Sequence, residues 1–216
     1  MSRIVILRPE PGASATLARA EAAGLDAVAM PLFEVTPIAW TAPAADHYDA
    51  LLLTSANAVR HAGAELGKLS TLPAYCVGAA TAAAATGAGL ALARTGSGDS
   101  AALEAQIPDG LRLLHLTGRE HRPLSGVTEI AVYGSTAIDP PPSLEALSDG
   151  VAMVHSPRAG ARLAELVEQR GTIAIAAISP TAAAACGAGW RAVASIAAPD
   201  DGALLALAAD LCHTSA

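Results

Sequence analysis

The chain has 216 residues, a formal net charge of −7 and 52% hydrophobic residues, many of them alanine. This content is enough for one or two substantial cores, and no apolar run approaches the roughly 18–20 residues that cross a membrane. The negative charge and an aromatic content of 3% argue against a general binder of nucleic acid or of an anionic membrane.

The start of the chain and the cysteines predict a cytoplasmic protein. Residues 3–7 form an apolar stretch that is too short for a secretory signal, and Pro9 follows closely. The cysteines are odd in number and widely spaced, at Cys76, Cys186 and Cys212. A reduced interior is therefore expected rather than a framework of disulfides.

Short apolar runs alternate with helical patterns along the chain. Strands or extended segments are predicted at 3–7, 27–31, 33–38, 50–53, 74–77, 90–93, 112–116, 130–133, 151–154, 172–178 and 192–196. Helices or helical turns are predicted at 15–23, 58–66, 100–106, 143–147, 158–170, 181–186 and 201–211, and an alanine helix that Gly87 ends is predicted after 78–81. Ser14 is expected to cap the first helix and Gly24 to end it. This alternation predicts an α/β fold with parallel sheets of the flavodoxin-like, doubly wound type.

The chain carries two copies of one unit. Residues 52–60 (LLTSANAVR) resemble residues 153–162 (MVHSPRAGAR), and an alanine-rich helix in each copy ends at Gly87 or Gly187. Matched landmarks in the same order favour a duplication. The first copy has only a short irregular stretch at 120–126, where a doubly wound unit normally has a helix.

The second copy has too few strands to complete a sheet, and the strand–helix–strand segment at the N-terminus can supply them. We therefore expect two flavodoxin-like domains joined by a two-strand connector. The expected boundaries are 1–35 and 140–216 for a discontinuous domain 1, 38–130 for an inserted domain 2, and 34–38 and 131–139 for the connector strands. Tyr133 lies in the second connector strand, and a groove between two lobes is a common place for a small-molecule site.

Polar residues and a glycine follow the predicted strand ends, where parallel sheets bind their ligands. The candidate substrate-binding residues are Arg8, Ser55, Asn57, Gly78, Thr81, Arg119, Ser156, Arg158, Ser179 and Thr181. The hydroxyl groups among them also have an ordinary structural explanation, since they can cap helices in any α/β protein. Helix N-termini present free N–H groups and arginine presents a planar fork, so the set as a whole suits a polycarboxylate.

Other motifs give no support to several enzyme classes. Residues 95–100 begin like a dinucleotide fingerprint but are followed by Ala101, and the sequence has neither a phosphate-binding loop nor a G-x-S-x-G elbow. His115, His121 and His155 lack the spacing of metal ligands, so they are expected at the surface or behind a site. No metal or cofactor is predicted.

Seven segments together resemble the uroporphyrinogen-III synthase family over essentially the whole chain. They are ILRPEP, LLTSANAV, YCVGAATA, LHLTGR, AVYGST, HSPR and ISPTAAA. The resemblance implies two similar α/β domains on a flexible two-strand connector. It also implies a cofactor-independent lyase of tetrapyrrole (haem) biosynthesis, in which hydroxymethylbilane loses water and closes to uroporphyrinogen III with ring D inverted.

By this resemblance, Tyr133 matches the catalytic tyrosine proposed to help the hydroxyl group leave, which is general-acid work. The alternative is a hinge tyrosine that packs between the lobes. The residues that match family positions facing the cleft are Ser55, Asn57, Gly78, Thr81 and Arg119, with Ser179 and Thr181 in the other domain. Gly134 departs from the pattern, because family members often have a larger residue there.

The implied partners are the small-molecule substrate hydroxymethylbilane and, transiently, the preceding enzyme, hydroxymethylbilane synthase. A monomer that binds neither nucleic acid nor membrane is expected. Two other functions stay open on the sequence. One is a non-catalytic two-lobed binding protein for a polyanionic small molecule, and the other is an α/β enzyme acting on nucleotides or sugar phosphates, which the missing phosphate loop disfavours.

Overall fold

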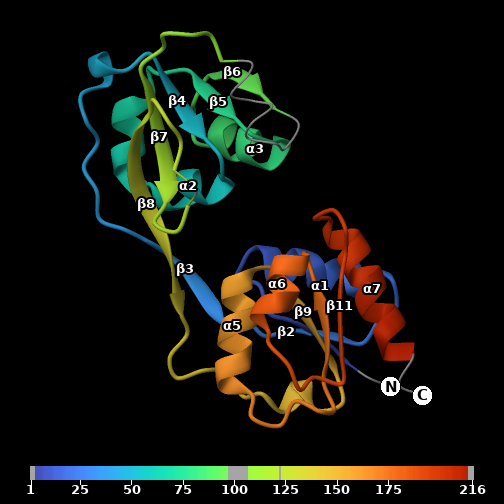
Figure 1. Cartoon of the computed structure of the whole chain (residues 1–216). Helices are drawn as coiled ribbons and strands as arrows, with labels where there is room; N and C mark the ends of the chain where they lie inside the picture. Colours follow the sequence, from blue (N-terminus) through green and yellow to red (C-terminus); the bar gives the residue numbers. More distant parts are fainter. Residues whose placement is uncertain (1–2, 97–106, 122, 214–216) are drawn as a thin grey trace. The chain divides into compact units, whose positions relative to one another are not determined.

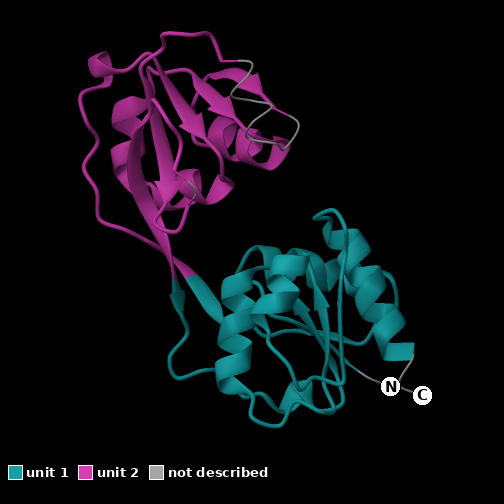
Figure 2. Ribbon diagram, viewed as in Figure 1, with its two compact units in different colours: residues 1–34, 136–216 teal, residues 35–135 magenta. Residues whose placement is uncertain are grey.

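The computed structural model describes residues 3–96, 107–121 and 123–213. Two compact units make up the chain, unit 1 of Met1–Glu34 with Thr136–Ala216 and unit 2 of Val35–Ser135 (Figure 2). The helix predicted at 100–106 lies outside the described residues.

Unit 1 is built around a parallel sheet with the strand order β11-β10-β9-β1-β2 (Figure 1). Its strands are β1 (Ile4–Ile6), β2 (Ala27–Ala29), β9 (Val151–Val154), β10 (Ala174–Ala177) and β11 (Ala192–Ser195). Its helices are α1 (Gly12–Ala22), a 3₁₀ turn (Glu145–Leu147), α5 (Pro157–Leu166), α6 (Pro180–Ala185) and α7 (Asp201–His213). The central strands are short apolar runs without alternation because helices cover both faces.

Two cores lie on opposite faces of this sheet. On one face, Val5 and Val154 pack with Leu163 of α5 and with Trp190. On the other face, residues of β1 and β9 pack with α1 and with α7, which contributes the buried Leu204. Each fully buried aliphatic side chain contributes about 1.5–3 kcal/mol relative to exposure, so these two layers hold unit 1 together.

Unit 2 contains the sheet β3-β8-β7-β4-β5-β6, in which the pairs from β8 to β6 are parallel. Its strands are β4 (Ala50–Leu53), β5 (Ala74–Cys76), β6 (Leu92–Thr95), β7 (Leu113–Gly118) and, reaching the unit boundary, β3 (Phe33–Pro37) and β8 (Thr128–Ala137). Its helices are 3₁₀ helices at Ala45–His47 and Gly63–Leu69, with α2 (Ala56–His61) and α3 (Ala79–Gly87). The core between the sheet and α2, α3 and the second 3₁₀ helix includes Leu51, Leu114 and Leu69.

The chain passes between the units within β3 and within β8. These strands pair in opposite directions, since the N–H of Ile38 donates to the carbonyl of Val132 at 2.9 Å and the N–H of Ile138 donates to that of Leu32 at 3.0 Å. The chain segments of β3 and β8 therefore form a two-stranded antiparallel ladder where the chain passes from one unit to the other.

The predicted α/β class with parallel sheets is confirmed, and several elements lie where they were predicted. Strand 151–154 matches β9 to the residue. The first helix was predicted three residues too late, because it begins at Gly12 after Pro11. Ser14 is therefore inside α1, and the Glu10 carboxylate accepts both its N–H, at 3.1 Å, and its hydroxyl, at 2.9 Å. Within the described residues, no helix is long and apolar enough to cross a membrane.

Candidate functional site

In unit 2, the candidate residues follow neighbouring strands at the same edge of the sheet. Ser55 comes after β4 and caps α2, with its hydroxyl oxygen accepting the N–H of Asn57 at 3.2 Å. Gly78 comes after β5 and begins α3, where Thr81 is buried. Arg119 comes directly after β7. Because parallel strands end at one edge, these residues lie along the carboxyl end of the sheet.

A β-bulge decides the face on which Tyr133 lies. The register of β7 and β8 pairs His115 with Glu129 but then shifts, so that Gly118 is paired with Tyr133. Strict alternation would put Glu129 and Tyr133 on one face. Tyr133 instead packs with Val132 against the α2 and α3 core. Bulges re-aim side chains in this way near functional sites.

The Tyr133 ring rests on a glycine. A β-carbon built on Gly118 would lie 2.6 Å from Cζ and 2.9 Å from Oη of Tyr133, so only a residue without a side chain leaves room for the ring. The ring centroid lies 6.1 Å from that of His61, at the end of α2. Burial, followed by the nearby Arg60 charge, lowers the pKa of His61, which favours a neutral imidazole beside the phenol.

The other polar residues of this edge have partners of their own. The backbone N–H of Arg119 donates to the carbonyl of Tyr133 at 2.8 Å, and Arg119 is an exposed residue. The Asn57 side-chain oxygen accepts from Arg60 at 3.2 Å. The hydroxyl of Ser55 caps α2, so helix capping is sufficient to explain why a serine is found at this position.

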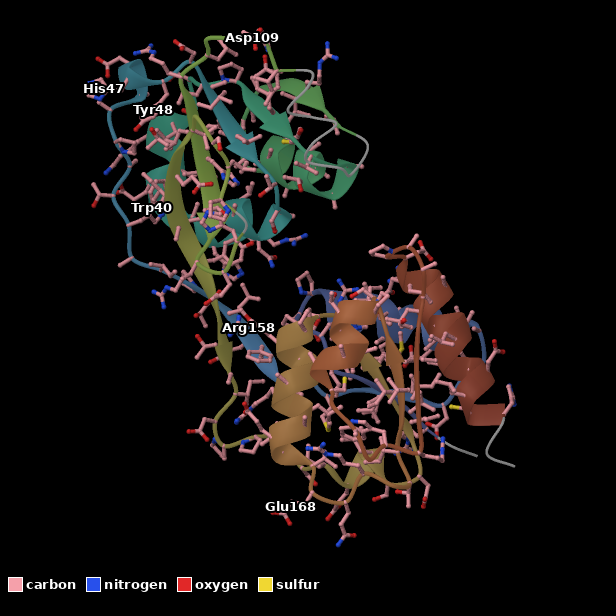
Figure 3. The ribbon with its side chains drawn as sticks, in the orientation of Figure 1. Trp40, His47, Tyr48, Asp109, Arg158 and Glu168 are labelled. Atoms are coloured by element: carbon pink, nitrogen blue, oxygen red, sulfur yellow. The ribbon has the colours of Figure 1, made fainter. Side chains whose placement is uncertain are left out.

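In unit 1, the candidate residues lie at the carboxyl ends of β1, β9 and β10. Ser156 caps α5 and Ser179 caps α6, each accepting a backbone N–H, and the hydroxyls of Ser179 and Thr181 lie 2.9 Å apart. The guanidinium of Arg158 stacks over the Phe33 ring, 4.6 Å from the ring centroid. Arg158, labelled in Figure 3, lies in the first turn of α5. The quadrupole of an aromatic ring attracts a cation placed over its face, so this contact helps to orient the guanidinium.

Arg8 is engaged with a carboxylate. Its Nη1 donates to Asp201 at 2.9 Å, and the guanidinium packs over Gly12, where an added β-carbon would clash with Arg8 Nε. Thr16 and His155 donate to the same carboxylate, at 2.9 and 2.8 Å, and Arg19 also pairs with it. Asp201 therefore joins α7 to β1, α1 and β9.

Asp201 is expected to stabilise unit 1 in a pH-dependent way. Burial alone would raise its pKa, but hydrogen bonds from His155, Arg19 and Thr16 outweigh burial and lower the pKa to about 2. A carboxyl whose pKa is depressed in the folded state contributes stability above its unfolded pKa, near 4, and loses that contribution as the pH falls towards 2.

Asp201→Asn should therefore lower the free energy of unfolding by about 1 kcal/mol at pH 7, a value reduced for the partial exposure of the group. Urea denaturation at pH 7 and pH 3 measures the effect, and the difference from the unsubstituted protein should shrink at pH 3. Asp149→Asn is the matched control because Asp149 is exposed and has φ 56°, a conformation that asparagine tolerates. An equal loss for both variants would contradict the expectation.

The three histidines were predicted at the surface or behind a site, and none of them is exposed, so only the position behind a site stays a prediction. His115 is 1% exposed, and His155 has a 10% exposed side chain. Each is paired with a carboxylate, His115 and His121 with Glu129 and His155 with Asp201. Isolated histidines in a sequence do not reveal these partners, because the carboxylates come from other strands and helices.

Within the described residues, the structure supports neither a metal-binding cluster nor an ionised thiol at Cys76 or Cys186. No group of three or more His, Cys, Asp and Glu side chains in that part of the chain is arranged to hold a metal ion. Burial raises the pKa of Cys76 and of Cys186 to about 11, so neither thiol is ionised at neutral pH.

Sequence reasoning missed Asp201 and Glu129, the two carboxylates on which polar networks converge. Glu129 lies opposite His115 in the register of β7 and β8. The sequence feature that could have indicated Glu129 is a charged residue at the start of a strand whose following residues are apolar. Such a residue is equally typical of an exposed strand end, so the pattern did not distinguish the two.

Comparison with known proteins gives the family of the chain. Residues 14–206 match the family described as uroporphyrinogen-III synthase HemD. No curated protein matches.

Two solved structures share the fold. A uroporphyrinogen-III synthetase from Helicobacter pylori aligns with a TM-score of 0.69 and 17% identity, covering 98% of this chain and 100% of that one. A mutant uroporphyrinogen III synthase from Thermus thermophilus aligns with a TM-score of 0.53 and 19% identity, covering 99% and 100%. With the family match spanning most of the chain and the same two-sheet fold in both structures, the chain belongs to the uroporphyrinogen-III synthase family.

Proposed function

We propose that this chain catalyses the cyclisation of hydroxymethylbilane to uroporphyrinogen III, with loss of water and inversion of ring D, in haem biosynthesis. The observation that carries the proposal is the family match over residues 14–206. The reaction joins one end of a flexible chain to the other at a substituted carbon. Holding that chain in the reactive conformation is positioning catalysis, which can remove several kcal/mol from a barrier.

The substrate carries carboxylate side chains, and the carboxyl edges of both sheets offer donors that suit them. At α3, no described side chain caps the helix at Gly78. The first N–H groups of α3 are therefore available to a substrate carboxylate, and the helix dipole favours a negative charge there. Arg119 and Arg158 add guanidinium groups at strand ends, which bind carboxylates as planar forks.

Tyr133 is the proposed catalytic residue. A phenol can donate a hydrogen bond or a proton to the departing hydroxide, and the environment described above fixes the ring against Gly118. The hydroxyl group leaves from the hydroxymethyl carbon on the first ring, and the substituted carbon of ring D at the other end of the chain attacks that carbon to give a spiro intermediate. The bond between ring D and its neighbouring ring then breaks and re-forms at the other α-carbon of ring D, which loses its proton, so that ring D is inverted.

The protein is further proposed to act as a cytoplasmic monomer that receives its substrate by transient contact with hydroxymethylbilane synthase. The substrate closes without a catalyst to the uninverted isomer, so direct transfer from the preceding enzyme would limit that loss. Light scattering of the protein alone measures its oligomeric state. Light scattering of its mixture with hydroxymethylbilane synthase measures the contact between the two enzymes.

The function is tested by supplying hydroxymethylbilane to the purified protein, without added metal or cofactor, and separating the product isomers. Uroporphyrinogen III is the expected product, formed faster than the uncatalysed uninverted isomer. Formation of the uninverted isomer alone would contradict the proposal. Binding of the substrate without faster closure would favour the non-catalytic binding protein instead.

Tyr133→Phe is expected to slow turnover about threefold to tenfold, because it keeps the ring and removes one hydrogen bond to the departing hydroxyl group, worth about 0.5–1.5 kcal/mol. Initial rates of uroporphyrinogen III formation measure the change, with circular dichroism as the check on folding. Tyr75→Phe is the control, since Tyr75 lies on β5 and packs on the opposite face of the sheet. An unchanged rate for Tyr133→Phe would remove the hydroxyl from the mechanism.

A further inference from the structure

The connection between β7 and β8 is irregular, and one carboxylate anchors it. Glu129 Oε1 accepts the N–H of Leu124 at 3.1 Å, and Glu129 Oε2 lies 2.9 Å from Nε2 of His121. Oε1 also lies 3.1 Å from Nδ1 of His115. The carboxylate of one β8 residue therefore binds two residues of the connection and one residue of β7.

The connection begins at the turn that carries Arg119. The N–H of Arg119 donates to the carbonyl of Tyr133, and Gly118 lies against the ring of Tyr133. His121 follows two residues later. Its Nδ1 is buried and makes no well-formed hydrogen bond with a described residue, yet its pKa is raised, first by Glu129 and also by the carbonyls of Gly118 and Arg119. Because Glu129 holds His121 at 2.9 Å and His121 lies two residues after Arg119, a shift of His121 would move the backbone next to the Gly118–Arg119 turn.

The same carboxylate reaches the end of β4 through His115. Nε2 of His115 lies 3.0 Å from the hydroxyl oxygen of Thr54. Thr54 directly precedes Ser55, the N-cap of α2. Glu129 thus connects the turn that carries Arg119 with the turn that carries Ser55, and both turns lie at the carboxyl edge of the sheet.

This network is suited to holding a geometry rather than to adding stability. The Glu129 side chain is 22% exposed, and taking a carboxylate out of water costs about as much as its ion pairs return. Burial raises its pKa, but hydrogen bonds from His121, Leu124 and His115 outweigh burial and lower the pKa to about 2. Glu129 is therefore ionised at neutral pH, and a carboxylate that holds three residues by hydrogen bonds selects one arrangement of those residues.

We infer that Glu129 is a positioning residue of the cyclisation, which acts through His121 and His115 to hold the turns after β7 and β4, so that Arg119 is placed to bind a substrate carboxylate. The inference rests on the proposed function. Glu129 does not touch the reacting atoms, so its loss should weaken substrate binding more than it slows the chemical step. A rise in KM with a smaller change in kcat is the expected signature.

The test compares Glu129→Gln with Glu65→Gln. Glu65 is a matched control in the same unit, because it also accepts a backbone N–H, that of Ala42 at 2.7 Å, and pairs with a basic side chain, Lys68. Glu129→Gln should raise KM for hydroxymethylbilane about threefold to tenfold, as expected for the loss of about one charge-assisted hydrogen bond. Glu65→Gln should leave KM unchanged. His121→Gln should raise KM in the same direction by a smaller factor, and it supplies the test if Glu129→Gln does not fold.

The outcomes separate the inference from the function on which it rests. If the unsubstituted protein forms only the uninverted isomer, the proposed function is overturned and the inference with it. If that protein inverts ring D but Glu129→Gln and His121→Gln match Glu65→Gln in both constants, the inference alone is overturned. A fall in kcat that follows the folded fraction, with KM unchanged, also overturns it, because a merely structural role predicts that result.

Discussion

Gly160→Ala is expected to lower the free energy of unfolding of unit 1 by about 2–3 kcal/mol. Gly160 lies in α5, and a β-carbon built on it would lie 2.8 Å from the carbonyl oxygen of Ala182 and 2.9 Å from Sγ of Cys186. Both atoms belong to the α6 region that packs against α5, and a backbone atom cannot rotate away. The two helices must therefore separate, which opens the core formed by Leu163 and Trp190.

Urea denaturation followed by the fluorescence of Trp190 measures this loss. The chain has two tryptophans, so a Trp40→Phe background leaves Trp190 as the reporter of unit 1. Gly171→Ala is the control in the same unit, because no described heavy atom lies within 4 Å of the added β-carbon. Alanine improves the helix propensity of α5 by about 1 kcal/mol. A net gain in stability for Gly160→Ala would therefore mean that the helices tolerate the closer contact.

Gly118→Ala is expected to slow uroporphyrinogen III formation about tenfold to a hundredfold while changing stability by less than about 1 kcal/mol. The added β-carbon would lie 2.6 Å from Cζ of Tyr133. A side chain can rotate away from such a contact, so the ring leaves its place and the fold persists. The expected effect exceeds that of Tyr133→Phe, because the hydroxyl and the adjacent Arg119 turn both move, and a displacement of about 1 Å can cost a hundredfold in rate.

A double-mutant cycle tests this explanation. If Gly118→Ala acts by displacing the Tyr133 hydroxyl, its effect on the rate should be smaller in a Tyr133→Phe background than in the unsubstituted protein. Gly67→Ala is the control within unit 2, where the described residues leave open space around the added β-carbon. Full additivity of Gly118→Ala and Tyr133→Phe would show that the two residues act independently.

Local patterns were sufficient to predict the class of the fold. The apolar run at 151–154 predicts β9 because a strand buried on both faces needs no alternation. The serine after β9 and the serine after β10 predict helix starts, and both are N-caps in the structure. The predicted cap at Ser14 failed for an equally local reason. Glu10 accepts two hydrogen bonds from Ser14 and moves the start of α1 to Gly12.

The candidate site was predictable in part. The sequence placed polar residues after strand ends, and the structure has them at the carboxyl edges of the two sheets, while their contacts with substrate stay predictions. What they bind within the protein was not predictable. Arg8 and Asp201 are 193 positions apart, and Phe33 meets Arg158 only after β3 and α5 have packed in the same unit.

The sequence by itself determined which segments become strands and helices, because burial and capping act on neighbours along the chain. Only the tertiary structure decided the face of Tyr133 and the partners of the histidines. One extra residue in β8 turns the phenol towards α2, and the strand order brings Glu129 beside His115. Strand register and the meeting of distant side chains depend on how the whole sheet pairs, and no local pattern carries that information.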